Sequence, residues 1–156
     1  MRLLKILIMI VAIPNISLAE DYKLLSANRA QLMLADADGQ ITGVGDIVQL
    51  WSITLRAPDQ LLPKRVAIVK MLNQFNCASN EGRVKAMIMY RKNESLVRND
   101  DLSNAPWSPI APDTQISGLK EFACGSQSDR KRLRSIAPFS LGQFIATVYD
   151  GGWPVD

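Results

Sequence analysis

The sequence has 156 residues, of which 47% are hydrophobic, 21% charged and 6% aromatic. That composition is typical of one globular domain and excludes a mostly disordered or collagen-like chain. The chain has no histidine, which excludes a histidine base and a histidine-ligated metal. Its two cysteines are too few for a four-thiolate zinc site.

The first residues, 1–19, have the pattern of a secretory signal peptide. Arg2 and Lys5 give a positive start, an apolar run follows, and Ala19 is the residue expected before the cleavage point. The apolar run is about half of the roughly 20 residues that span a bilayer, so a cleaved signal is favoured over an uncleaved anchor. We therefore expect a periplasmic, secreted or cell-surface protein with no integral membrane segment after cleavage.

The net charge gives no reason to expect a nucleic-acid partner. The chain has 18 basic and 15 acidic residues, a net charge of +3. Two of the basic residues lie in the expected signal peptide, so the mature chain has a net charge of only +1. Such a small charge does not steer a protein towards nucleic acid or an anionic membrane. Residues 20–156 are enough for one domain with its own core.

Strands are expected in the first half of the mature chain. Residues 23–26 and 31–35 predict two short strands or one interrupted strand, and the Asp-Gly pair within 36–39 predicts a hairpin turn. Gly43 and Gly45 indicate a further bend. The next stretch, residues 47–56, alternates in polarity as a strand does. Its mostly apolar face consists of Ile47, Gln49, Trp51, Ile53 and Leu55.

Two longer strands are expected next. Residues 65–77 predict a strand, with helix as the alternative for its first part, and Cys77 shares a face with Val69 and Phe75. After a turn, residues 83–91 predict a returning strand. Its expected inward side chains are Val84, Ala86, Ile88 and Tyr90. A short strand over 95–98 follows.

The last third of the sequence predicts helices. Residues 99–112 are rich in turns and prolines, and a helix capped by Asp113 or Thr114 is expected to reach about Cys124. Residues 141–149 predict a second short helix after a Ser140 cap, with strand as the alternative. The expected fold class is α+β: an antiparallel sheet of about five or six strands with a helix packed on one face.

An exported chain with two cysteines is expected to form a disulfide, because the compartments outside the cytoplasm are oxidising. Cys77 and Cys124 are much too far apart in the sequence for a redox-active Cys-x-x-Cys motif. Two free buried thiols and an intermolecular bond are the alternatives.

Several short motifs occur in a characteristic order. Phe75-Asn76-Cys77-Ala78 ends one strand and Tyr90 ends the next, Trp107-Ser108-Pro109-Ile110-Ala111-Pro112 follows, and Phe122-Ala123-Cys124 ends the first helix. In these motifs, residues 22–125 resemble the surface-adhesin protein E family of exported bacterial proteins. The resemblance implies an antiparallel sheet with a helix tethered across one face by the disulfide. Residues 126–156 fall outside the resemblance and form a C-terminal extension in which one short helix is expected.

Some candidate sites have a structural alternative. The run from Asp36 to Gln40 has part of a calcium-loop spacing but lacks the third oxygen ligand and the distal Glu, so a hairpin turn is favoured and no metal or cofactor is expected. Trp107 is expected either to cover the sheet edge or to be an exposed contact. Trp153 is expected either to anchor an interface or to pack back onto the domain.

A basic cluster lies between the two expected helices and consists of Arg130, Lys131, Arg132 and Arg134. It is interpreted either as a solvated linker or as a contact for phosphate, an acidic glycan or an acidic protein patch. No enzyme is expected, because a nucleophile without histidine needs a Lys, Asp or Glu base and no such pair is apparent. The carboxylates of Asp100 and Asp101 are expected in turns.

The sequence thus predicts an exported, non-catalytic binding protein that is similar to an adhesin and holds another macromolecule through its sheet surface or C-terminal tail. Adhesion to host matrix proteins is what the resemblance implies for the member that names the family. The alternative is a periplasmic accessory or inhibitor protein that acts on another exported bacterial protein. A protein partner is expected in both cases, and a homo-oligomer is compatible with the sequence.

Overall fold

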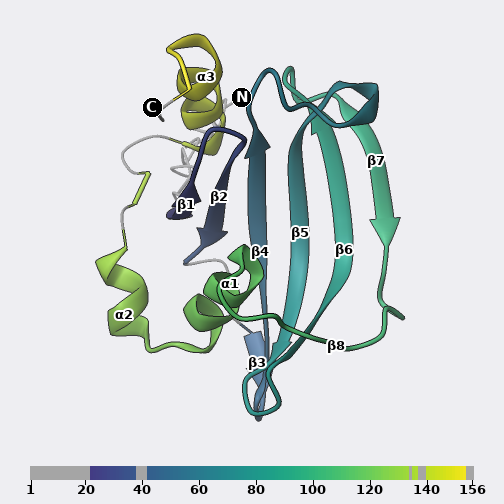
Figure 1. Ribbon diagram of the computed structural model, residues 1–156, viewed down its shortest axis with the longest axis vertical. Helices are drawn as coiled ribbons and strands as arrows, with labels where there is room; N and C mark the ends of the chain where they lie inside the picture. Colours follow the sequence, from purple (N-terminus) through teal and green to yellow (C-terminus); the bar gives the residue numbers. More distant parts are fainter. Residues whose placement is uncertain (1–21, 38–41, 134, 137–139, 154–156) are drawn as a thin grey trace, which may run out of the picture.

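The computed structural model describes residues 22–37, 42–133, 135–136 and 140–153. In these residues eight strands form one antiparallel sheet. Six of them follow the order β1-β2-β4-β5-β6-β7, and the other two are short: β3 pairs with β4 and β8 pairs with β6 (Figure 1). The α+β fold with an antiparallel sheet and C-terminal helices is thus confirmed. The expected signal peptide and the Asp-Gly pair of the expected 36–39 turn lie outside the described residues.

The strands are β1 (Tyr22–Ala27), β2 (Gln31–Asp36), β3 (Thr42–Val44), β4 (Ile47–Arg56), β5 (Val66–Asn76), β6 (Glu81–Arg91), β7 (Leu96–Asp101) and β8 (Ser108–Pro109). The helices are α1 (Gln115–Cys124), α2 (Gln127–Arg132) and α3 (Leu141–Asp150), and a single 3-10 turn spans Pro63–Arg65.

The sheet has more strands than the five or six that the sequence predicts. β3 and β8 have only three and two residues, which is too short to produce an alternating pattern. β3 pairs with β4 through a tight turn in which Gly45 adopts a φ of 61°, a conformation that glycine reaches without steric cost. β8 pairs with β6 at Glu81 and Gly82. β7 continues to Asp101, where turns are expected from the sequence.

Two hydrophobic cores lie on opposite faces of the sheet. In β2 and β4, successive side chains alternate between the two cores, because neighbouring residues of a strand point to opposite faces. The first core joins the sheet to α3 through Leu32, Leu34, Ile53, Leu55, Ile68, Ile145 and Val148. The second joins it to α1 through Met33, Ala35, Leu50, Phe75, Leu119, Phe122 and Ala123. α3, which belongs to the C-terminal extension, therefore covers the face of the sheet opposite α1. The single packed helix expected from the sequence would leave that face open.

One of the four side chains expected on the inward face of β6, Val84, lies on the other face, because the strand contains a bulge. The register with β5 shifts between the pairs Leu72–Ala86 and Asn73–Val84, which leaves Lys85 as the extra residue. A bulge moves the following side chains to the other face of the sheet. As a result Val84 pairs with Asn73 on the α1 face, whereas Tyr90 packs against the core beneath α3.

α1 is fixed at both ends. At its start Ser117 N donates to Thr114 Oγ1, and the Ser117 hydroxyl and the Thr114 backbone complete a capping box. At its end Cys124 forms a disulfide with Cys77, with a Cα–Cα distance of 5.7 Å that is ordinary for such a bond. The expected disulfide between the end of a strand and the end of a helix is confirmed.

The disulfide is expected to contribute a large part of the stability. It closes a loop with a sequence separation of 47 residues, so reduction should lower the free energy of unfolding by about 4 kcal/mol through the entropy of the unfolded chain. Urea unfolding of the oxidised and reduced mature protein, followed by circular dichroism, measures this difference. A double Cys77→Ser, Cys124→Ser variant is the control and should behave like the reduced protein. Identical midpoints with and without reductant contradict the expectation.

α3 is attached to the sheet through the hydroxyl of Tyr149. This group donates to the backbone carbonyls of Arg56 and Ala67, at 2.7 and 2.9 Å. The carbonyls belong to β4 and β5, so one side chain joins the helix to two strands. Burial raises the pKa of Tyr149 to about 12.

Replacing Tyr149 with Phe is expected to lower the free energy of unfolding by about 1–2 kcal/mol near neutral pH, because the hydrogen bonds to two strands are lost. The raised pKa means that the folded state keeps the proton when the unfolded state loses it. The contribution of Tyr149 is therefore complete below pH 10 and is lost as the pH rises to about 12.

Urea midpoints of the wild type and of Tyr149→Phe, measured near pH 7 and between pH 10 and 12, test this. The difference between the two proteins should shrink at the higher pH. A Tyr90→Phe variant is the matched control, because it removes a phenol from the same core and retains Tyr149. An unchanged difference across the whole pH range would show that the phenol of Tyr149 is not responsible.

Candidate functional site

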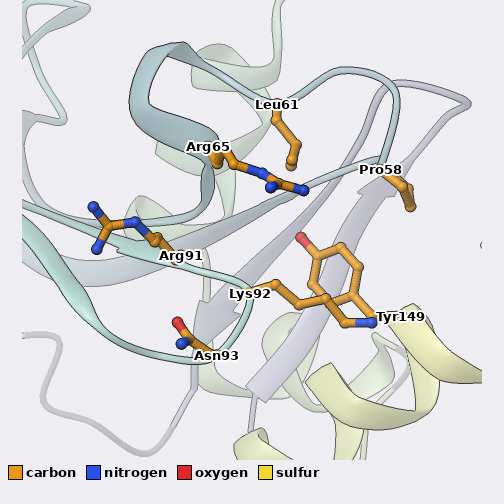
Figure 2. A pocket seen from close by; sticks show the side chains of 7 residues that line it. All are labelled: Pro58, Leu61, Arg65, Arg91, Lys92, Asn93 and Tyr149. Atoms are coloured by element: carbon orange, nitrogen blue, oxygen red, sulfur yellow. The ribbon is translucent and has the colours of Figure 1, made fainter.

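A cleft of about 540 Å³ opens at one end of the sheet, where the β4–β5 loop, the β6–β7 turn and α3 meet (Figure 2). Its lining residues are Pro58, Leu61, Arg65, Arg91, Lys92, Asn93 and Tyr149. We call it the basic cleft, because three of these side chains are cationic and none is acidic. Arg65 and Arg91 both reach this end of the sheet, because the antiparallel register pairs Val66 with Arg91, at the start of β5 and the end of β6.

The loop before β5 holds Arg65 in an unusual backbone conformation. Lys64 and Arg65 have φ values of 62° and 59°, in the left-handed region that non-glycine residues rarely adopt. A hydrogen bond of 3.1 Å from Leu62 N to Val66 O closes this loop. The strained conformation is therefore stabilised locally, and it directs the Arg65 side chain outward from the end of the sheet.

The β6–β7 turn on the other side of the cleft is also tightly closed. Arg91 N donates to Ser95 O at 3.0 Å, and Glu94 N donates to Arg91 O at 2.9 Å. Glu94 also has a positive φ, of 60°. Asn93 Oδ1 accepts from Ser95 N at 3.2 Å. Both walls of the basic cleft are thus short, hydrogen-bonded segments.

The three cations of the cleft differ in their partners. Arg65 has no hydrogen bond or ion pair from its guanidinium to any residue that the structure describes. Arg91 donates to Ser95 Oγ at 3.2 Å and has no carboxylate partner among the residues that the structure describes. Lys92 Nζ lies 2.8 Å from Asp150 Oδ1 and 5.6 Å from the centroid of the Tyr149 ring. The charge of Lys92 is therefore neutralised, and the two guanidinium charges are not.

The cleft also has an apolar side. In Figure 2 the guanidinium of Arg65 extends towards the side where Leu61, Pro58 and the Tyr149 ring lie, whereas Arg91 points away from them. Leu61 and Tyr149 both pack at the margin of the α3 core. The arrangement can therefore hold an anion next to an apolar group. It contains no nucleophile paired with a base.

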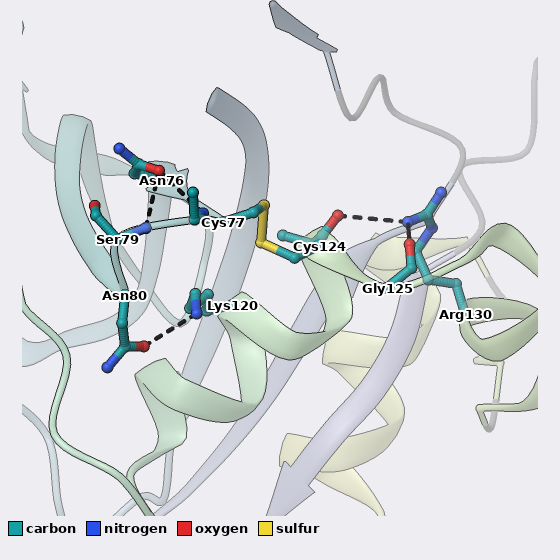
Figure 3. The surroundings of a disulfide bond; sticks show 10 residues. Asn76, Cys77, Ser79, Asn80, Lys120, Cys124, Gly125 and Arg130 are labelled. Carbon is teal, nitrogen blue, oxygen red and sulfur yellow. Dashed lines mark hydrogen bonds between the residues drawn. A yellow bond between two sulfur atoms is a disulfide. The ribbon is translucent and has the colours of Figure 1, made fainter. Parts of the chain in front are cut away.

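The structure separates the four basic residues of the predicted cluster. Arg130 Nη1 donates to the carbonyls of Gly125 and Ala123, at 2.5 and 3.4 Å, and so satisfies the carboxyl end of α1 beside the disulfide (Figure 3). Arg132 lies 3.8 Å from Asp129. Lys131 is exposed, and Arg134 lies outside the described residues.

The basic cluster does not lie in a linker, as the sequence suggested, because most of it is part of α2. Ser126 caps this helix by accepting a hydrogen bond from Asp129 N, and basic residues fill its last turn. The C-terminal extension thus contains two described helices where one was expected. The short length of α2 and its lack of buried residues explain why no apolar pattern reveals it.

The tryptophans considered as contacts are held by the domain itself. Trp153 donates from Nε1 to Asn28 O at 3.0 Å, and its ring lies 6.0 Å from that of Tyr149. The guanidinium of Arg83 lies 4.6 Å from the centroid of the Trp107 ring. Both rings are half-buried, and each has a contact within the domain.

The adjacent carboxylates Asp100 and Asp101 lie in β7 and not in a turn. Asp100 accepts from Arg98 Nε at 2.6 Å. Asp101 accepts from the hydroxyl and the backbone N–H of Ser103, and these two hydrogen bonds lower its pKa. Among the described residues no cluster of three or more Cys, Asp or Glu residues is placed to hold a metal ion. The described helices are all too short or too polar to cross a membrane.

The sequence did not reveal the basic cleft, because its residues come from three distant segments. Arg65 and Arg91 each looked like the polar end of a strand. The only sign of the cleft in the sequence is that Arg65 directly precedes one strand, β5, and Arg91 ends the next, β6. A hairpin of these two strands brings both residues to the same end of the sheet.

The surface-adhesin protein E family matches residues 24–125, which is well over half of the chain. The matched range starts within β1 and ends directly after Cys124, so it contains nearly the whole sheet, α1 and both cysteines. α2 and α3 lie beyond it. No curated protein and no solved structure matches the chain. This match, together with the sheet and the disulfide-tethered helix, shows that the chain belongs to the surface-adhesin protein E family.

Proposed function

We propose that the protein is an exported, non-catalytic binding protein that holds a protein partner as an adhesin does. Family membership implies a surface adhesin role and a non-enzymatic protein. The observation that supports a specific binding surface is the basic cleft. Its two guanidinium groups lack carboxylate partners among the described residues, and no hydrogen bond gives Arg65 a role in holding the fold.

Export is the second part of the proposal. Residues 1–19 act as a cleaved signal peptide, and the Cys77–Cys124 disulfide fits an oxidising compartment, because cytosolic thiols are kept reduced. The family implies an exported or cell-surface protein. We place the mature protein on the outer side of the cell, where an adhesin meets its partner.

In the C-terminal tail, Lys131 remains as an exposed cation, and Arg132 is an exposed residue whose pairing with Asp129 is long. Ion pairs this exposed contribute little to stability, so both side chains are available to a partner. Arg130 and Trp153 are engaged within the domain. The proposed surface therefore consists of the basic cleft first and the exposed charges of α2 second.

Protease treatment of intact cells tests the location. An adhesin should be digested by an added protease while a periplasmic marker protein in the same cells stays intact. Because the disulfide makes the fold resistant to cleavage, the purified mature protein is first used to find conditions under which it is digested. Digestion only after the outer membrane is permeabilised would contradict surface exposure. It would favour the periplasmic accessory or inhibitor role.

A further inference from the structure

We infer that the basic cleft binds an acidic segment of the partner protein, with one carboxylate on Arg65, another on Arg91 and an apolar side chain against Leu61 and Tyr149. This inference rests on the proposed function as a binding protein and names the partner's chemistry. Tyr149 lies in α3, outside the range that matches the family, so the cleft includes a part that the family match does not cover.

The charges of the cleft favour a carboxylate ligand. A guanidinium is planar and always charged, and its parallel N–H groups match the two oxygens of a carboxylate. Arg65 has all of its donors available among the described residues, and Arg91 uses one nitrogen on Ser95. Asp150 already pairs with Lys92, and none of the described residues that line the cleft is acidic. The two guanidinium groups point in different directions (Figure 2), so an acidic segment would place a separate carboxylate on each.

The apolar side of the cleft favours a peptide over a glycan. Pro58, Leu61 and the face of the Tyr149 ring offer a surface that gains stability only from an apolar group. A sulfated or carboxylated sugar has the negative charge but has no apolar side chain to place there. A protein segment in which an acidic residue adjoins an apolar one satisfies both sides at once.

The backbone of the cleft is arranged before any ligand binds. Three of the five non-glycine residues with positive φ in the described chain border it, namely Lys64, Arg65 and Glu94. Strained residues of this kind persist where the surrounding structure holds them, and they are frequent at ligand-binding loops. Glu94 itself lines a separate cavity with Lys70 and Tyr90, so its carboxylate does not occupy the basic cleft. A preorganised site loses less entropy on binding.

An NMR titration of the isotopically labelled mature protein tests the inference. The probe is a short blocked peptide of alternating Glu and Leu, and the comparison peptide has Gln in place of Glu. The Glu-Leu peptide should shift the amide signals of residues 58–65 and 91–95, with binding that weakens as salt is added. The Gln-Leu peptide should bind at least tenfold more weakly.

The variants Arg65→Gln and Arg91→Gln should each weaken binding of the Glu-Leu peptide at least threefold, and together by tenfold or more. Leu61→Ser should weaken it without changing the salt dependence. Arg98→Gln is the matched control, because it removes the same charge from an exposed position in β7, outside the proposed binding surface, and should leave binding unchanged. Unchanged urea midpoints verify that each variant is folded. If the strained loop does not tolerate a change at Arg65, Arg91→Gln alone tests the contribution of the arginines to peptide binding.

Three outcomes would overturn the inference. These are no binding of the Glu-Leu peptide at millimolar concentration in low salt, equal binding of the Gln-Leu peptide, and equal weakening by Arg98→Gln. Tighter binding of a sulfated oligosaccharide that does not depend on Leu61 would identify a glycan site instead. None of these results alters the protease experiment on intact cells, so failure of this inference is distinguishable from failure of the proposed function.

Discussion

The alternation of side chains along β2 and β4 is the constraint on which the rest of the structure depends. Both strands are apolar on two sides, so each face of the sheet needs its own cover. α1 covers one face and is held there by the disulfide. α3 covers the other and is held by the Tyr149 hydroxyl, which binds carbonyls of β4 and β5. The two helices therefore use different bonds for the same purpose.

The position of α3 also creates the basic cleft. When Tyr149 docks against the ends of β4 and β5, its ring forms one wall beside the loop of Arg65 and the turn of Arg91 (Figure 2). Other basic residues with an equal claim to a binding role serve the fold instead. Arg130 completes the carboxyl end of α1, and Arg83 lies on the Trp107 ring. Availability for a partner thus depends on which charges the fold leaves without an internal contact.

Local patterns predicted the elements that are long enough to show them. β4, β5 and α3 follow their alternation, their apolar spacing and, for α3, the Ser140 cap. The patterns failed where a single residue changes the geometry. The bulge at Lys85 turns Val84 away from the face of Tyr90, and polarity along the strand gives no sign of it. β8 and α2 are too short for any periodicity.

The sequence by itself determined the longer strands, the capped helices α1 and α3 and the pairing of the only two cysteines, because each depends on residue type and local spacing. Only the tertiary structure decided which face α3 covers, which arginines remain unpaired, and where Trp153 packs. Those outcomes depend on contacts between segments far apart in the chain, such as Tyr149 with Arg56. Local spacing contains no information about such contacts, since many arrangements of the same elements bury the same apolar residues.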